Sequence, residues 1–211
     1  MDEKVNQSKD KNVDTRHNLL ESASALFLEK DFHSVSIREI AQHAGTTSGM
    51  INYYFKSKHG LFEEMIKFQY SQFISIIMMN QQDLESFDYV VFIKQFQKMY
   101  RDNPNMAKFL IKTSPISSGP GSQFLKDTFE FSRQMMDARG KELKKRGWIA
   151  EETDFEVVRI VCLCLTLLPG YMQDIFKHAY GEEGYEKFQD TFAEFVGGML
   201  TKAISLKDES E

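Results

Sequence analysis

The side chains best suited to specific chemistry lie in one short stretch, Thr47–Lys58 (TSGMINYYFKSK). Within it Ser48, Gly49, Asn52 and Tyr53 recur three and four residues apart, so they share one face if the stretch is helical. Asparagine can bond an adenine edge through two hydrogen bonds, tyrosine hydroxyls suit phosphate oxygens, and small residues let a helix lie deep in a groove. These residue types and their spacing indicate contact with double-stranded DNA.

Two short helices are needed to present this face. The segment Ser36–Glu39 (SIRE) is a capping box that starts a helix of about two turns, which Gly45 ends in a left-handed conformation. A second short helix follows, with Ile51 and Phe55 on its buried side. Two short helices joined by a glycine-containing turn, with a preceding helix packed across them, form a helix-turn-helix unit. Ordinary packing of small helices gives the same pattern and is the alternative.

The chain as a whole is predicted to be all-α, with about nine helices, because apolar residues recur three and four apart and no run alternates strictly. Residues 1–12 are expected to be a flexible arm. The first helix, Asp14–Glu29, has Leu19, Ala23, Leu26 and Phe27 on its apolar face, and Ser57 caps a long helix ending near Met79. Further helices are expected at Phe87–Tyr100, Met106–Lys112, Gln123–Arg146, Asp154–Ala179 with a break at Pro169, and, after Gly181 and Gly184, Tyr185–Leu206.

The segment from Arg16 to Met65 resembles the DNA-binding domain of the TetR family of bacterial transcriptional regulators. The resemblance is carried by SIREIA at 36–41, AG at 44–45, SGMINYYFKSK at 48–58 and LF at 61–62, with Arg16 and ALF in the first helix. It implies a helix-turn-helix domain at 13–60, a helical ligand-binding and dimerisation domain at 61–206 and a polar tail at 207–211. It also implies a homodimer that acts as a ligand-responsive repressor on a palindromic DNA operator.

Position by position, the resemblance implies a set of residues that face DNA. They are Ser36, Arg38, Thr47, Ser48, Gly49, Met50, Asn52, Tyr53, Tyr54 and, on a phosphate, Lys58. The window Ile40–Phe62 holds Lys56, Lys58, His43 and His59 and no carboxylate, so it can approach phosphates without repulsion. Asp31, Asn52 and Gly60 depart from the family's usual glycine, tyrosine and acidic residue. The change at Asn52 bears on the operator sequence rather than on DNA binding.

An apolar seam runs along the last predicted helix, through Tyr185, Phe188, Phe192, Phe195, Met199, Ala203 and Leu206. Such a seam needs a partner helix, and the glycine pair inside it would let another backbone come close. Packing within the protomer and pairing with a second copy both fit this pattern. The family resemblance favours a dimer interface, with Phe188, Phe192, Phe195, Gly197, Gly198 and Met199 as its residues.

The C-terminal part is rich in phenylalanine and methionine, of which the chain has 18 and 11. These residues fit an ordinary core, although methionine also lines adaptable pockets. With the family resemblance they imply a cavity for an apolar or amphipathic effector. Its candidate polar contacts are Tyr100, Arg133, Gln134, Tyr171, Gln173 and His178.

Composition and motifs exclude several classes. With 42% hydrophobic and 27% charged residues, the chain is neither fibrous nor wholly disordered. Its longest uncharged apolar stretch, Ile160–Leu168, is far shorter than the roughly 20 residues of a membrane span, and no apolar leader is seen. We therefore expect a cytoplasmic protein without a membrane partner. Cys162 and Cys164, inside that stretch, are expected to be buried and reduced.

An enzyme is the first rival interpretation, but no metal-ligand spacing, nucleophile elbow, P-loop or dinucleotide fingerprint occurs in the sequence. We therefore expect no catalytic residue, metal or cofactor. The second rival is a small-molecule or lipid carrier that uses the helical cavity and has no DNA function. Substitution of Asn52 and Tyr53 separates the two, because only a DNA reader would depend on them.

Overall fold

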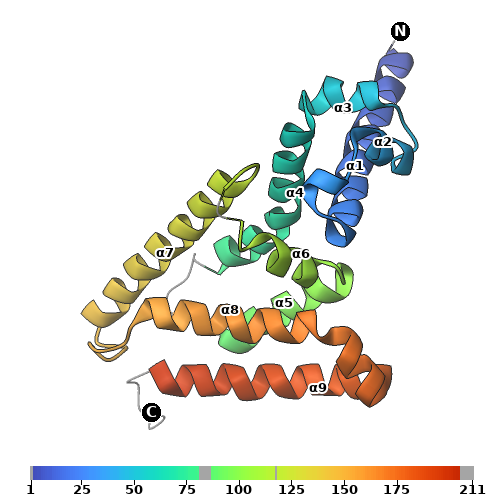
Figure 1. The fold of residues 1–211 in the computed structure, drawn as a ribbon. Coiled ribbons are helices and arrows are strands. Elements are labelled where there is room, and N and C mark those ends of the chain that lie inside the picture. The colour runs from blue at the N-terminus through green and yellow to red at the C-terminus, as the bar shows by residue number, and fades with distance from the viewer. Residues whose placement is uncertain (1, 81–86, 117, 205–211) are drawn as a thin grey trace. The chain divides into compact units, whose positions relative to one another are not determined.

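The computed structural model describes residues 2–80, 87–116 and 118–204, with side chains from residue 14 onward. Over these ranges it contains nine α-helices, one short 3-10 helix and no strand (Figure 1). The predicted all-α class and the number of helices are therefore confirmed. The helices form two compact units, one within residues 1–71 and 109–126 and the other within 72–108 and 127–211. The predicted tail, 207–211, lies outside the described residues.

The first unit is built on a helix-turn-helix. Its elements are α1 (Asp2–Glu29), η1 (Phe32–Ser34), α2 (Ile37–His43), α3 (Ser48–Phe55), the first half of α4 (Lys58–Met79), the end of α6 (Met106–Thr113) and the start of α7 (Ser122–Lys145). The predicted apolar face of the first helix is confirmed, because its four residues are all buried. Helices α2, α3 and α4 contribute further buried residues, namely Ile40, Ala41, Ile51, Phe55, Leu61, Phe62 and Met65.

Helix α1 begins at Asp2, not near Asp14 as the sequence suggested. The expected flexible arm at residues 1–12 therefore falls, from residue 2 onward, within the helix. No glycine or proline interrupts this stretch. Polar composition was the reason to expect a flexible arm, but composition alone does not stop a helix.

The second unit consists of the end of α4, α5 (Tyr89–Asp102), the start of α6, most of α7, α8 (Phe155–Tyr171) and α9 (Gln173–Ile204). Helix α5 packs mainly against α9 and also against α8, and α8 and α9 lie side by side (Figure 1). The cluster at their junction comprises Ile93, Cys162, Ala193, Val196 and Leu200. A buried polar chain adds to it, because Gln97 Nε2 donates to the Gln189 carbonyl at 2.8 Å and Gln189 Nε2 donates to the Tyr185 hydroxyl at 2.9 Å.

The predicted break at Pro169 is wrong by a few residues. Pro169 lies inside α8, which ends at Tyr171, and the Met172 amide donates to the Leu168 carbonyl at 3.0 Å to close the last turn. A proline removes only one helical hydrogen bond, and packing of the next residue, Gly170, against Tyr100 holds this turn in place. The second expected break is found at Gly181, whose φ of 72° and ψ of 170° kink α9.

Candidate nucleic-acid interface

Helix α2 starts and ends with the caps that the sequence predicted. The Glu39 amide donates to Ser36 Oγ at 3.1 Å and the Ser36 amide donates to Glu39 Oε2 at 3.4 Å, so the capping box is present. Gly45 has a φ of +65°, which suits glycine, and the next amide, of Thr46, donates to the Ala41 carbonyl at 2.9 Å. These contacts fix the direction in which α3 leaves the turn.

Helix α3 packs against the rest of the first unit through its two buried apolar residues. Ile51 is fully buried and Phe55 is 5% exposed. The guanidinium of Arg16 on α1 lies 5.4 Å from the centroid of the Phe55 ring, and its Nη2 donates to Glu64 on α4 at 2.9 Å. Arg16 thereby connects α3 with both long helices of the first unit, and α3 is a rigid part of that unit.

The opposite face of α3 is exposed. Gly49, Asn52 and Tyr53, which we call the reading face, are all exposed, and the Tyr53 side chain is 63% accessible. A Cβ added at Gly49 would meet only Thr47 Oγ1, at 3.6 Å, so the backbone is open to close approach there. The predicted grouping of small, amide and aromatic residues on one side of a short helix is therefore confirmed as geometry.

The two tyrosines of α3 have different surroundings. Their rings meet edge to face with centroids 4.9 Å apart, but Tyr54 is half-buried whereas Tyr53 is exposed. Burial, and secondarily the charge of Tyr53, raise the pKa of Tyr54 above its usual value. The Tyr54 hydroxyl is therefore neutral near pH 7, and the hydroxyls of both tyrosines can donate hydrogen bonds to phosphate oxygens.

Lys58 does not extend from the surface as its predicted phosphate contact suggested. Its ammonium lies 4.4 Å from the centroid of the Phe32 ring, and burial lowers the pKa of this lysine. Phe32 belongs to an aromatic group with Phe27, Phe62 and His59. In this position the Lys58 ammonium makes a cation–π contact within the unit, and its phosphate contact stays a prediction.

The remaining predicted DNA-facing residues surround the reading face. Arg38, Ser36 and Thr47 are exposed, and Ser48 and Met50 are half-buried. Lys56 was not among the predicted residues, although it is exposed and directly follows the last residue of α3. The lack of carboxylates in residues 40–62 was the available signal.

The predicted effector contacts are scattered in the second unit. Arg133, Gln134, Tyr171 and His178 are exposed. Gln173 is 2% exposed and its Nε2 donates to the Pro104 carbonyl at 3.0 Å. Tyr100, also 2% exposed, differs from the others because its hydroxyl has no hydrogen-bond partner among the described residues.

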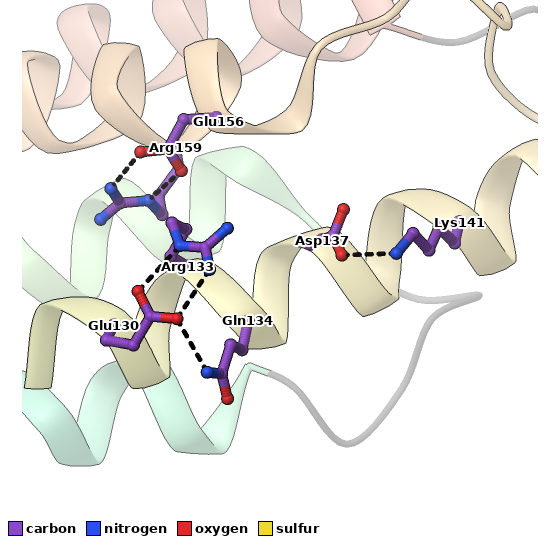
Figure 2. A network of polar contacts seen from close by, with 7 residues as sticks. All are labelled: Glu130, Arg133, Gln134, Asp137, Lys141, Glu156 and Arg159. Carbon is purple, nitrogen blue, oxygen red and sulfur yellow. Dashed lines mark hydrogen bonds and ion pairs between the residues drawn. The ribbon is translucent and has the colours of Figure 1, made fainter. Parts of the chain in front are cut away.

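Arg133 and Gln134 take part in a surface network on α7 instead (Figure 2). Both donate to Glu130, and bonds from Arg133 and then Gln134 lower the pKa of this carboxyl to about 2. Neighbouring pairs are Asp137 with Lys141 on α7 and Glu156 with Arg159 on α8. A cavity of about 430 Å³ lies between this part of α7 and the start of α8, and its lining carries charges of both signs. This surface does not resemble an apolar effector pocket.

The predicted dimer residues divide into two groups. Phe195, at 72% exposure, and Met199, at 44%, are on the outside of α9, and a Cβ at Gly198 would meet nothing within 4 Å. Gly197 faces inward, because a Cβ there would come within 2.5 Å of Val90 Cγ2 on α5. Phe192 packs partly into the core cluster, and Phe188 stacks with aromatic neighbours that include Phe176 and Tyr185.

Helix α8 also has an apolar stripe that points outward. Its exposed members are Val157, Ile160, Val161, Cys164, Leu168 and Tyr171. The expectation that both cysteines are buried is therefore half wrong, since Cys162 is buried and Cys164 is exposed. Residues three and four apart on one helix share a face, whereas residues two apart do not, so the two thiols point in different directions.

In the part of the chain that the structure describes, no group of three His, Cys, Asp or Glu side chains is placed to hold a metal ion. No single described helix has the length and hydrophobicity to cross a membrane. Only α8 and α9 together meet that test of length and composition, as a pair bent by 69°.

Comparison with known proteins gives matches to the helix-turn-helix and to the whole fold. Residues 19–65 match the family described as bacterial regulatory proteins, tetR family. Over 54 residues the chain is 44% identical to the probable HTH-type transcriptional regulator YttP of Bacillus subtilis. The matched segment covers 26% of this chain and 26% of that protein. Over 148 residues it is 22% identical to the HTH-type transcriptional repressor KstR2 of Mycobacterium tuberculosis, covering 68% of this chain and 73% of that protein.

Two solved structures share the fold over nearly the full length. A TetR family transcription regulator of Marinobacter aquaeolei gives a TM-score of 0.65 at 15% identity, covering 93% of this chain and 98% of that chain. The structure of KstR2, the ketosteroid transcriptional regulator of Mycobacterium tuberculosis, gives a TM-score of 0.60 at 17% identity, covering 91% and 95%. At such identities the similarity shows a common fold.

Proposed function

The chain belongs to the TetR family of bacterial regulatory proteins, and on this premise we propose that it is a sequence-specific DNA-binding regulator that represses transcription in the cytoplasm. The observation that carries the proposal is the reading face. Gly49, Asn52 and Tyr53 are exposed on a helix whose other side is fixed by Ile51 and Phe55. A helix held in this way can enter the major groove and present an amide to a base edge.

The proposed active form is a homodimer. Helices α8 and α9 pack against each other, and each keeps an apolar stripe exposed in the single chain. Phe195, Met199, Leu168 and Val157 would leave water if a second copy covered these stripes. A two-fold dimer presents two reading faces to two half-sites, so the proposed operator is an inverted repeat.

The proposed effector is an apolar or amphipathic molecule with one hydrogen-bonding oxygen, which Tyr100 would contact. A buried hydroxyl without a partner costs about 1–3 kcal/mol, and such a ligand would remove that cost. The Tyr100 ring itself packs on α8, because a Cβ at Gly170 would come within 2.4 Å of Tyr100 Cδ2. Effector binding would shift the dimer toward a state that no longer matches the operator, which requires different affinities for the two states.

The experiment that tests DNA recognition is selection of genomic fragments by the purified protein, followed by titration of the best fragment and of a scrambled version. We expect the selected fragment to bind about a thousandfold more tightly than the scrambled one. Changing Asn52→Ala and Tyr53→Ala should remove most of this difference. Gln123→Ala, an exposed change on α7, is the control and should leave it intact.

The carrier interpretation predicts the opposite result. A carrier would bind both fragments equally weakly, and its behaviour would not change with Asn52 or Tyr53. An enzyme would be indicated by turnover on a substrate together with indifference to both DNA fragments. Either result would overturn the proposed function.

A further inference from the structure

One residue next to the reading face has an unusual backbone. Lys56 is the only residue other than glycine with a positive φ in the described part of the chain, with φ of 65° and ψ of −30°. This region of backbone conformation disfavours L-residues with a side chain, and glycine adopts it at no steric cost. A long charged side chain at such a position is a reason to look for a use of that side chain.

Lys56 directly follows the reading face along the chain. The Lys56 amide donates to the Asn52 carbonyl at 3.2 Å, so this residue closes the last turn of α3 although it is no longer part of the helix. Its Nζ lies 3.2 Å from the Tyr53 carbonyl, to which it donates. The ammonium therefore lies at the C-terminal end of α3, next to Tyr53 of the reading face.

The contact with the Tyr53 carbonyl does not by itself account for the lysine. This hydrogen bond is exposed, where water can replace the ammonium at little cost. Lys56 forms no ion pair with any described carboxylate, and residues 40–62 contain none. Its positive charge is thus uncompensated at the edge of the reading face.

Lys58, the other lysine in this window, is placed differently. Its ammonium lies against the Phe32 ring and is partly withdrawn from water, which lowers its pKa. The Lys56 side chain is exposed. Of the two, Lys56 is the one whose charge is available without rearrangement.

We propose that Lys56 binds a backbone phosphate of duplex DNA beside the bases contacted by the reading face, and that its left-handed conformation is kept for this contact. The inference rests on the proposed function, because it assigns a further contact to the same DNA interface. A phosphate contact carries no sequence information, so it acts on duplexes of any sequence and on the selected operator alike.

The test measures salt dependence on a fluorescently labelled duplex of arbitrary sequence, with the full-length protein. Each lost phosphate contact lowers the slope of log K against log salt concentration by about 0.9. We expect this decrease, for each protomer bound, in Lys56→Gln but not in Lys56→Arg, which keeps the charge. Lys67→Gln is the matched control, because Lys67 is an exposed lysine of the same unit that pairs with Glu64 on α4.

Lys56→Gly separates this role from a structural one. Glycine removes the backbone strain together with the charge, so this variant should melt at or above the temperature of Lys56→Gln while showing the same loss of slope. An unchanged slope in Lys56→Gln, or an equal decrease in Lys67→Gln, would overturn the inference and leave the proposed function standing. Absence of any salt-dependent binding by the wild-type protein would instead overturn the proposed function itself.

Discussion

The guanidinium of Arg16 on α1 lies over the ring of Phe55, the last residue of α3. The same guanidinium pairs with Glu64 on α4, at 2.9 Å. The Arg16 side chain of α1 therefore contacts both α3 and α4. The contact explains why an arginine, with a flat and permanently charged head group, occupies this position.

Arg16→Gln should lower the free energy of unfolding by about 1 kcal/mol, because a cation–π contact and a half-exposed ion pair are both lost. Urea titration followed by circular dichroism measures this change. Lys67→Gln removes the second partner of Glu64 and leaves the Phe55 contact, so it should change stability by less than about 0.5 kcal/mol. Equal effects of the two substitutions would mean that the Phe55 contact adds nothing.

The two glycines around α3 should respond differently to alanine. Gly45 has a φ of +65°, so Gly45→Ala should cost about 1–2 kcal/mol through backbone strain alone, since nothing lies within 4 Å of the added Cβ. Gly49 has ordinary helical geometry and room for a methyl group, so Gly49→Ala should leave the melting temperature unchanged or higher. Its effect should be confined to DNA affinity. A lower melting temperature for Gly49→Ala would contradict the open space around Gly49.

Tyr100→Phe should leave stability unchanged or raise it by up to about 1 kcal/mol, because it removes a buried hydroxyl that has no partner among the described residues. Tyr70→Phe is the matched control, since Tyr70 is 6% exposed and its hydroxyl hydrogen-bonds Thr113 Oγ1 at 3.1 Å. Losing that bond should cost about 1 kcal/mol. If Tyr100→Phe is as destabilising as Tyr70→Phe, the Tyr100 hydroxyl is already satisfied in the free protein.

Phe195→Glu should convert the proposed dimer to a folded monomer. The side chain is 72% exposed in the single chain, so the substitution costs the protomer little, whereas it would place a charge in an apolar interface. Light scattering coupled to size-exclusion chromatography measures the mass. Phe131→Glu, at a 46% exposed position on α7, is the control and should remain dimeric. If both variants are dimeric, Phe195 is not part of the dimer interface.

The two cysteines should differ in their rate of alkylation under native conditions. The monomeric Phe195→Glu variant is used because the proposed dimer would cover the stripe of α8 that contains Cys164. Burial raises the pKa of Cys162 to about 11, which reduces its thiolate fraction near pH 8 about a hundredfold relative to an ordinary thiol. The rate of Cys162 alkylation should therefore increase only as the pH rises toward this pKa. Cys164 is exposed and should be modified first, as peptide mass spectrometry would show. Faster modification of Cys162 would contradict the packing of α8.

The helix-turn-helix was determined by local sequence. The capping box at Ser36 and Glu39, the left-handed Gly45 and the buried spacing of Ile51 and Phe55 all act within a few residues, and the structure confirms each of them. The exposed reading face follows directly, because burying one side of a short helix leaves the other side for contacts. The same local rules placed most helices correctly.

Tertiary structure decided the features that depend on distant residues. The position of Lys58 depends on Phe32, and the inward orientation of Gly197 depends on Val90. The Tyr100 hydroxyl lacks a hydrogen-bond partner because none of the described residues packed around it offers one. A residue's own helix fixes which face it occupies but not what lies opposite. Periodicity could therefore predict an apolar seam on α9 but could not divide it into core and exposed surface, because that division is made by the packing of α5 and α8.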